Sequence, residues 1–190
     1  MSEEGLLIVI RSSVNFVTAF AALVSMGGAP RASIMMGKGD KETAEKILGN
    51  CTTMLVLMAA VLTAVILLFG KPILLMFGAS DNTIGYAWDY MSIYAMGTIF
   101  VQISLGLNAF INAQGYARTG MLTVAIGAIC NIILDPILIF GLDMGVKGAA
   151  LATILSQAVS FVWVLRFLTS GKSFLRIRKG YLKLSADIIL

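Results

Sequence analysis

Histidine is absent from the sequence, which excludes imidazole ligation of a metal and a histidine-based proton relay within this chain. Cysteine occurs only twice, as Cys51 and Cys130, and these positions lack the spacing of a metal site or a redox pair. Because both lie within strongly apolar stretches, we interpret them as small buried side chains.

Charged residues are also scarce, at 13% of the chain against 58% hydrophobic residues. The mean hydropathy of +0.92 is too high for a soluble domain of 190 residues. About 20 apolar residues cross the hydrocarbon core of a bilayer as a helix. Five stretches are long and apolar enough to do so: residues 12–30, 47–70, 90–117, 120–140 and 148–165. We therefore predict an all-α, polytopic transmembrane helix bundle with about five spanning helices.

The basic residues are distributed unevenly between the expected loops. All but three of the 14 Lys and Arg residues lie between the first and second stretches, between the third and fourth, or after the fifth. Because Lys and Arg are enriched on the cytoplasmic side of a membrane, we expect these three segments to face the cytoplasm. This topology explains the net charge of +4 and leaves no case for nucleic-acid binding.

Asp135 is an acidic residue inside the otherwise uncharged stretch 120–140. An ionised carboxylate at the centre of a membrane helix costs about 2.5 to 3.5 kcal/mol on the scale that assigns it the least. Asn131 lies one helical turn earlier on the same face, and Pro136 follows directly. The pattern predicts a cation site beside a helix kink at Pro136, in which the Asn131 amide coordinates a cation or stabilises the carboxylate.

Polar side chains repeat at helical spacing in three of the stretches, which is typical of helices that surround an aqueous cavity. The alternative is that they hold helices together by hydrogen bonds, and we favour this alternative for Ser104, Gln157 and Ser160. The candidate cavity-lining residues are Gln102, Ser104, Asn108, Asn112 and Gln157, and the fourth stretch adds the stripe Thr123, Gly127, Asn131 and Asp135.

The carboxylates do not support an enzyme. Membrane enzymes acting on prenyl diphosphates need clustered carboxylates for magnesium, and intramembrane proteases need paired aspartates or a Ser-His arrangement. A single carboxylate in the bundle fits ion coupling better than catalysis. A passive channel is harder to exclude than an enzyme, but the predicted kink and the acidic residue in the same helix favour a gated, cation-binding protein.

Five motifs occur in order between Val14 and Leu190, and together they resemble the multidrug and toxic compound extrusion (MATE) family. They are Met26-Gly-Gly-Ala-Pro30, Gly37-Lys-Gly-Asp40, Asn112-Ala-Gln-Gly115 with Arg118, Asn131-Ile-Ile-Leu-Asp-Pro136, and Gly145-Val-Lys-Gly-Ala-Ala150 leading to Thr153.

The resemblance implies a twelve-helix, two-lobe transporter of the bacterial plasma membrane that exports cationic lipophilic drugs in exchange for Na+ or H+. This chain looks like helices two to six of the N-terminal lobe. The family's cation site in that lobe implies coupling roles for Asn131, Asp135 and Thr153, and these three are the Na+ ligands if Na+ is the coupling ion. Its second carboxylate lies on helix one, outside this chain. Neither ion is favoured by the sequence, and no other cofactor is expected.

The resemblance also suggests a division of the chain. Residues 1–13 are expected to be an N-terminal stub outside the native helix, and residues 14–170 a partial transmembrane lobe. Residues 171–190 are expected to be a basic cytoplasmic linker on anionic membrane lipids, followed by the start of the next helix. The expected partners are organic cations, membrane lipids and the C-terminal lobe.

The aromatic residues Tyr86, Trp88, Tyr90 and Tyr94 are interpreted as an interfacial belt rather than a drug-binding cage. Two rival functions remain: a lipid-linked oligosaccharide flippase of the same superfamily, which needs a cationic cavity, and a non-transporting structural membrane protein.

Overall fold

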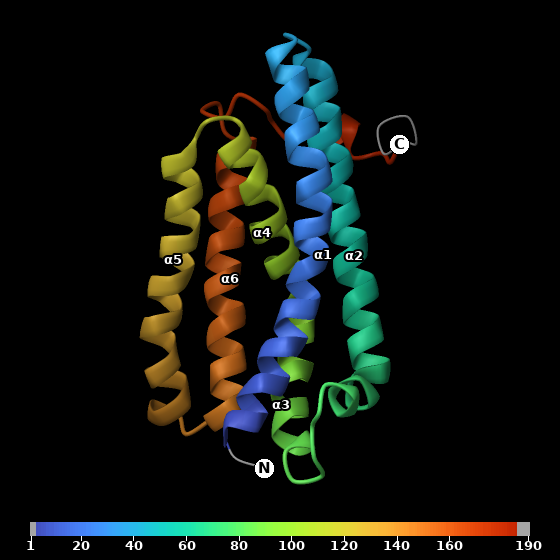
Figure 1. The fold of residues 1–190 in the computed structure, drawn as a ribbon. Helices are drawn as coiled ribbons and strands as arrows, with labels where there is room; N and C mark the ends of the chain where they lie inside the picture. The colour runs from blue at the N-terminus through green and yellow to red at the C-terminus, as the bar shows by residue number, and fades with distance from the viewer. Residues whose placement is uncertain (1–2, 186–190) are drawn as a thin grey trace.

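The structure is a computed structural model that describes residues 3–185 and is helical apart from its connecting segments (Figure 1). Four of its helices are long and apolar enough to cross a membrane, and there are five such spans if one bent pair counts as one. The helices are α1 (Glu3–Gly37), α2 (Lys41–Met76), α3 (Ile84–Met96), α4 (Thr98–Ala113), α5 (Ala117–Pro136) and α6 (Gly145–Thr169), with a π-helical turn η1 (Ile137–Gly141) and a 3-10 turn η2 (Lys179–Tyr181). The prediction of an all-α bundle with about five spans is confirmed.

The third predicted span is divided into α3 and α4, which are bent by 61°. The break is at Gly97, where Ile154 of α6 packs closely against the backbone. A Cβ atom on residue 97 would lie 2.5 Å from Cγ1 of Ile154. The absence of a side chain therefore allows α6 to approach the bend.

The N-terminal stub expected for residues 1–13 does not match the structure, because α1 is helical from Glu3. Val9 is buried in an apolar cluster that includes residues of α2 and α3, and Ser13 is also buried. The Ser13 hydroxyl donates to the carbonyl oxygen of Val9 at 2.9 Å. Packing against the neighbouring helices thus stabilises this first part of α1 as helix.

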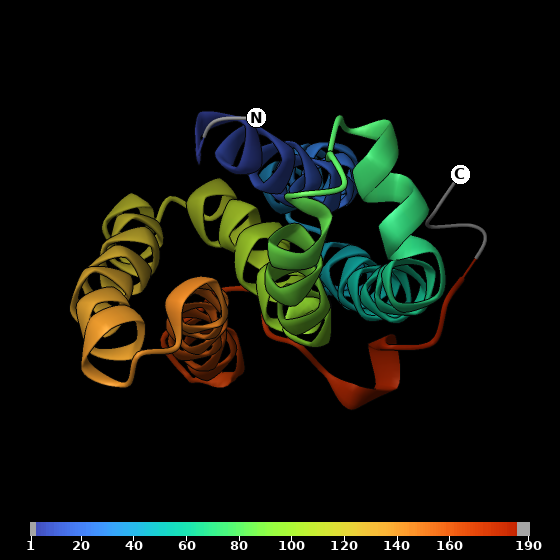
Figure 2. The same ribbon diagram turned by 90° about the horizontal axis from the view of Figure 1, so that it is seen from below.

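α4 lies in the middle of the bundle and packs against α1, α2, α5 and α6. Within residues 3–185, neither α5 nor α6 packs directly against α1 or α2. Figure 2 shows this division, with α1 and α2 on one side of α4 and α5 and α6 on the other. The bundle therefore consists of two helix pairs joined through α3 and α4.

The ends of α1, α4 and α6 and the starts of α2 and α5 lie at one end of the bundle (Figure 1). We call this the basic end, because the three Lys- and Arg-rich segments of the sequence meet there. The segment 171–185 crosses this end from α6 to α2 (Figure 2). The predicted start of a further helix at residues 186–190 lies outside the described residues.

The first residue before α2 caps that helix at the basic end. The Asp40 carboxylate accepts a hydrogen bond from the backbone N–H of Thr43 at 3.0 Å. Hydrogen bonding with Thr43 lowers the pKa of Asp40 below its ordinary value, because it stabilises the ionised carboxylate.

Candidate functional site

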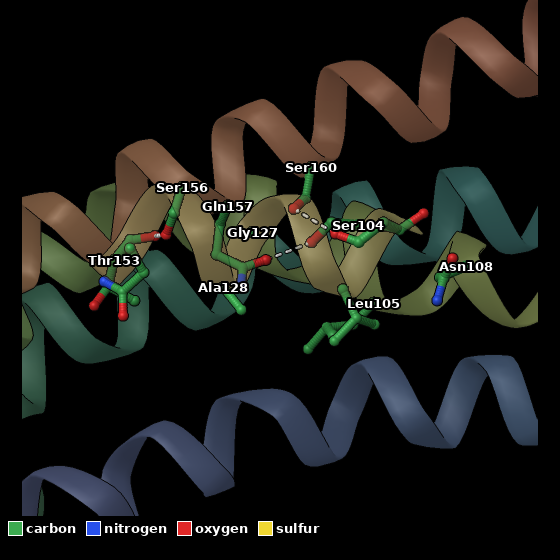
Figure 3. A pocket seen from close by; sticks show the side chains of 12 residues that line it. Ser104, Leu105, Asn108, Gly127, Ala128, Thr153, Ser156, Gln157 and Ser160 are labelled. Atoms are coloured by element: carbon green, nitrogen blue, oxygen red, sulfur yellow. Dashed lines mark hydrogen bonds between the residues drawn. The ribbon is translucent and has the colours of Figure 1, made fainter. Parts of the chain in front are cut away.

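A cavity of about 240 Å³ lies between α4, α5 and α6. Its walls are small and polar, and none of the residues that line it is charged. Figure 3 shows side chains from the three helices converging on it. The lining residues are Ser104, Leu105, Asn108, Thr123, Val124, Gly127, Ala128, Asn131, Thr153, Ser156, Gln157 and Ser160.

Hydrogen bonds between helices hold the cavity walls together. The Ser104 hydroxyl of α4 donates to Oε1 of Gln157 on α6 at 2.7 Å (Figure 3). Ser160 of α6 donates to the carbonyl oxygen of Thr123 on α5 at 3.1 Å. These contacts agree with the interpretation that Ser104, Gln157 and Ser160 join helices, although the same side chains also face the cavity.

Asn108 also links a wall of the cavity to its neighbour. Its amide nitrogen donates to the carbonyl oxygen of Gly120 at 3.2 Å. Its amide oxygen has no hydrogen-bond partner within the described part of the chain. Asn108 therefore joins α4 to α5 through its amide nitrogen, while its amide oxygen makes no hydrogen bond to the described part of the chain.

Asp135 is half-buried near the opposite end of α5 from the basic end, and it is paired with Asn131. The Asn131 amide nitrogen donates to Oδ1 of Asp135 at 3.3 Å. This bond leaves the amide oxygen of Asn131 free to accept or to coordinate. Asn131 also lines the cavity, so it connects the carboxylate to the polar walls.

Two side chains from other helices complete this group. Thr153 of α6 lines the cavity, and its hydroxyl donates to the carbonyl oxygen of Ala149 at 2.9 Å. Tyr90 of α3 lies near both Thr153 and Asp135 and interacts with them electrostatically. The site therefore combines a carboxylate, an amide and two hydroxyl groups from three helices. Oxygen atoms of these kinds are the ligands that hard cations prefer.

Tyr90 was not among the predicted site residues, because its aromatic neighbours favoured an interfacial belt. Tyr86 is 59% exposed and fits that interpretation, whereas Tyr94 is only 1% exposed and belongs to the core. Tyr90 and Tyr94 stack with ring centroids 6.0 Å apart. The sequence carries no signal that separates Tyr90 from its aromatic neighbours, because the packing of α3 along α6 depends on the bend at Gly97.

Two predicted cavity residues lie elsewhere. Gln102 is fully buried between α4 and α1, where its amide nitrogen donates to the carbonyl oxygen of Val17 at 2.7 Å. Asn112 lies beside Gly120, where the missing side chain of the glycine leaves room for it, at the α4–α5 contact. Asn112 has the spacing of the polar stripe, whereas Gln102 is two residues before Ser104 and lies on another face of α4; both lie against neighbouring backbones rather than the cavity.

The helix changes its hydrogen-bonding pattern directly after Pro136. Residues 137–141 form the π-helical turn η1, and the N–H of Leu142 donates to the carbonyl oxygen of Ile137 at 2.9 Å. Proline has no N–H, so the carbonyl oxygen of Ile132 loses its usual helical donor. The sequence predicts a helix kink at Pro136; the structure has a π-helical turn directly after this proline and next to Asp135.

No group of three or more Cys, Asp or Glu side chains that could hold a metal ion occurs within residues 3–185. The polar oxygen atoms that this chain brings near Asp135 belong to uncharged side chains, Asn131 and Thr153.

These features define a polytopic helical membrane protein that encloses an uncharged polar cavity with one carboxylate at its side. The family model MatE matches residues 7–137, and the chain belongs to this family. It is a family of membrane transporters and not of enzymes.

Curated relatives include the multidrug export protein MepA of Staphylococcus haemolyticus, which is 32% identical over 142 residues, or 75% of this chain and 31% of the relative. The probable multidrug resistance protein YoeA of Bacillus subtilis is 25% identical over 93% of this chain and 41% of its own length. A FAD transporter of Shewanella oneidensis is 26% identical over 76% of this chain and 33% of its own length. The chain thus spans less than half the length of these relatives.

Among solved structures, an inward-facing multidrug resistance MATE family transporter of the MOP superfamily superimposes with a TM-score of 0.87 at 25% identity. The match covers 97% of this chain and 42% of that structure. A MOP superfamily transporter from Pyrococcus furiosus gives a TM-score of 0.90 at 24% identity, covering 97% of this chain and 41% of that structure, and supports the fold. The expectation that this chain is part of a larger two-lobe fold is consistent with this coverage.

Proposed function

We propose that the protein containing this chain is a multidrug efflux antiporter, which exports cationic lipophilic compounds across a bacterial inner membrane in exchange for Na+ or H+. In this proposal the chain provides helices two to six of the N-terminal lobe. Membership of the MatE family and the multidrug export relatives support the general activity. The C-terminal lobe and membrane lipids are the proposed partners.

The observation that carries the coupling proposal is the pairing of Asp135 with Asn131 beside the cavity. An ionised Asp135 accepts the amide hydrogen bond of Asn131. A proton arriving at Asp135 removes its charge and adds a donor. A Na+ ion instead takes oxygen ligands from Asp135, Asn131 and Thr153.

Either ion changes the hydrogen bonding of α5 one residue before Pro136. The helix is already irregular there, because proline lacks an N–H and η1 follows. We propose that ion binding shifts the bend of α5 relative to α6 and narrows the polar cavity, which helps to release the drug.

The lining of the cavity supports organic cations over anionic substrates. Export of a lipid-linked oligosaccharide or of FAD requires cationic side chains to balance phosphate groups. None of the residues that line the cavity between α4, α5 and α6 is Lys or Arg. The flippase alternative therefore has less support in this part of the protein.

The test is ethidium efflux from cells that express the complete reading frame containing this segment, under an imposed Na+ gradient and then a proton gradient. Efflux driven by one gradient supports the antiporter and identifies its ion. Absence of efflux under both gradients, with the protein present in the membrane, would favour the flippase or the structural alternative.

A further inference from the structure

The segment 171–185, which we call the strap, is bound to the bundle along its length (Figure 2). It begins after α6 and reaches the start of α2. It was expected to be a linker lying on the membrane surface. Three of its backbone N–H groups donate to side chains of the bundle, as the following contacts show.

Gln114, directly after α4, binds the first part of the strap. Its side-chain oxygen accepts the N–H of Leu175 at 2.8 Å and the hydroxyl of Ser173 at 3.0 Å. Leu175 is fully buried in the same apolar cluster as Leu168 of α6 and residues of α1, α2 and α4. The strap therefore contributes a side chain to the core and does not only cover it.

Glu45 of α2 binds the middle of the strap. This side chain is only 2% exposed, and its Oε2 lies 2.6 Å from Nε of Arg178. Its Oε1 accepts the backbone N–H of Arg176 at 3.3 Å. A carboxylate this deeply buried needs a partner. Loss of the contact with Arg178 is therefore expected to destabilise the protein more than loss of an exposed ion pair.

Two further residues of α2 bind the last part of the strap. Oδ1 of Asn50 accepts the N–H of Ser185 at 2.8 Å, and the Thr53 hydroxyl donates to the carbonyl oxygen of Leu182 at 2.6 Å. Gly49 allows the carbonyl group of residue 181 to approach α2, because a side chain at Gly49 would collide with it.

The position of the strap gives these contacts a mechanical consequence. The pair α5–α6 does not pack directly on the pair α1–α2 within residues 3–185. The strap connects them across the basic end. At the opposite end, α3 and α6 share the ion pair between Lys147 and Asp89, whose atoms are 3.5 Å apart and whose side chains are 55% and 42% exposed. Such an exposed pair adds little to the restraint that the packing of α3 against α6 provides at this end.

We propose that the strap fixes the distance between the two helix pairs at the basic end, and that the Glu45–Arg178 ion pair is the main contact that holds it there. Relative movement of the two pairs is then concentrated at the opposite end, next to Asp135. This inference concerns the mechanics of the bundle and is independent of the substrate or ion that the protein carries.

The first test is hydrogen exchange of the complete protein in nanodiscs. The amides of Leu175, Arg176 and Ser185 are expected to be protected. Arg178→Gln leaves the buried Glu45 unpaired and is expected to raise their exchange rates about tenfold or more. The matched control is Glu42→Gln, because Glu42 lies on the same helix but is exposed and pairs with Lys46, at 2.8 Å. This control is expected to leave the three amides protected.

The double variant Glu45→Gln/Arg178→Gln distinguishes loss of the Glu45–Arg178 ion pair from general misfolding. Removing both charges is expected to restore much of the protection lost in Arg178→Gln, because no unpaired buried carboxylate remains. Equal exchange in Arg178→Gln and the native protein, or unprotected strap amides in the native protein, would overturn the proposal.

The second test measures spin-label distances at the basic end, between positions Lys38 and Thr169, in a background without the two native cysteines. The native protein is expected to give a narrow distribution that broadens in Arg178→Gln but not in Glu42→Gln. A second pair at Met76 and Leu142 reports on the opposite end, where the native distribution is expected to be broader. A native distribution that is as broad at the basic end as at the opposite end would contradict the inference.

Discussion

Replacing Gly97 by alanine tests the close approach that bends the third span. The new Cβ atom would lie 2.5, 2.6 and 2.8 Å from Cγ1, Cγ2 and Cδ1 of Ile154. Carbon atoms normally approach to about 3.5–4.0 Å, so three contacts would be too short at once. Ile154 is only 9% exposed and branched at Cβ, so it cannot turn away without moving α6.

We expect Gly97→Ala to lower the free energy of unfolding by about 1–3 kcal/mol, which is the usual cost of overpacking. The measurement is reversible unfolding of the purified protein in detergent. Gly85→Ala is the matched control in α3, because no heavy atom lies within 4 Å of its added Cβ. Replacing a glycine inside a helix with alanine raises the free energy of unfolding by about 0.5–1 kcal/mol, so Gly85→Ala is expected to be at least as stable as the native protein.

The double variant Gly97→Ala/Ile154→Ala identifies the cause of the loss. Removing the Ile154 side chain alone leaves a cavity, but the new methyl group fills part of it, so the double variant should be more stable than the sum of the single effects by about 1–3 kcal/mol. If Gly97→Ala is as stable as the native protein, or the two effects simply add, Ile154 does not determine the bend.

Three further predictions concern the site and the core. Tyr90→Phe, which removes a hydroxyl group near Thr153 and Asp135, should weaken the dependence of efflux on the coupling ion about three- to tenfold, whereas Tyr86→Phe should not change it. Gln102→Leu should change the free energy of unfolding by less than about 1 kcal/mol, because it removes an unpaired buried amide oxygen together with one hydrogen bond. Asp40→Ala should lower the thermal stability at neutral pH. The pKa of Asp40 is lowered in the folded protein, so its contribution is present above the unfolded pKa and lost as the pH falls through the folded value; the difference between variant and native unfolding curves should shrink there.

The sequence was sufficient to predict the membrane bundle, its basic end and the pair Asn131–Asp135. Each of these depends on local composition or on residues one helical turn apart. An uncharged stretch, by contrast, shows that a segment can cross a membrane but not that it bends. The 61° bend at Gly97 depends on contact with Ile154, 57 positions later in the chain.

The same limit explains the misplaced side chains. Asn112 shares the polar stripe of Ser104 and Asn108, yet it lies beside Gly120 of α5 and does not line the cavity, and Gln102 packs on α1. The aromatic cluster around Tyr90 has the composition of an interfacial belt, and nothing in that composition shows that α3 packs against α6. The basic composition of the strap likewise gave no sign that a buried Glu45 holds it.

The central claim is that Asp135 couples ion entry to drug export. Ethidium efflux should be measured for the native protein and for Asp135→Asn at equal abundance in the membrane, under the gradient that drives the native protein. Asp81→Asn, a change of an exposed loop carboxylate, is the control and should retain efflux. The account predicts that Asp135→Asn abolishes gradient-driven efflux while the protein still reaches the membrane. Efflux equal to that of the native protein would contradict it.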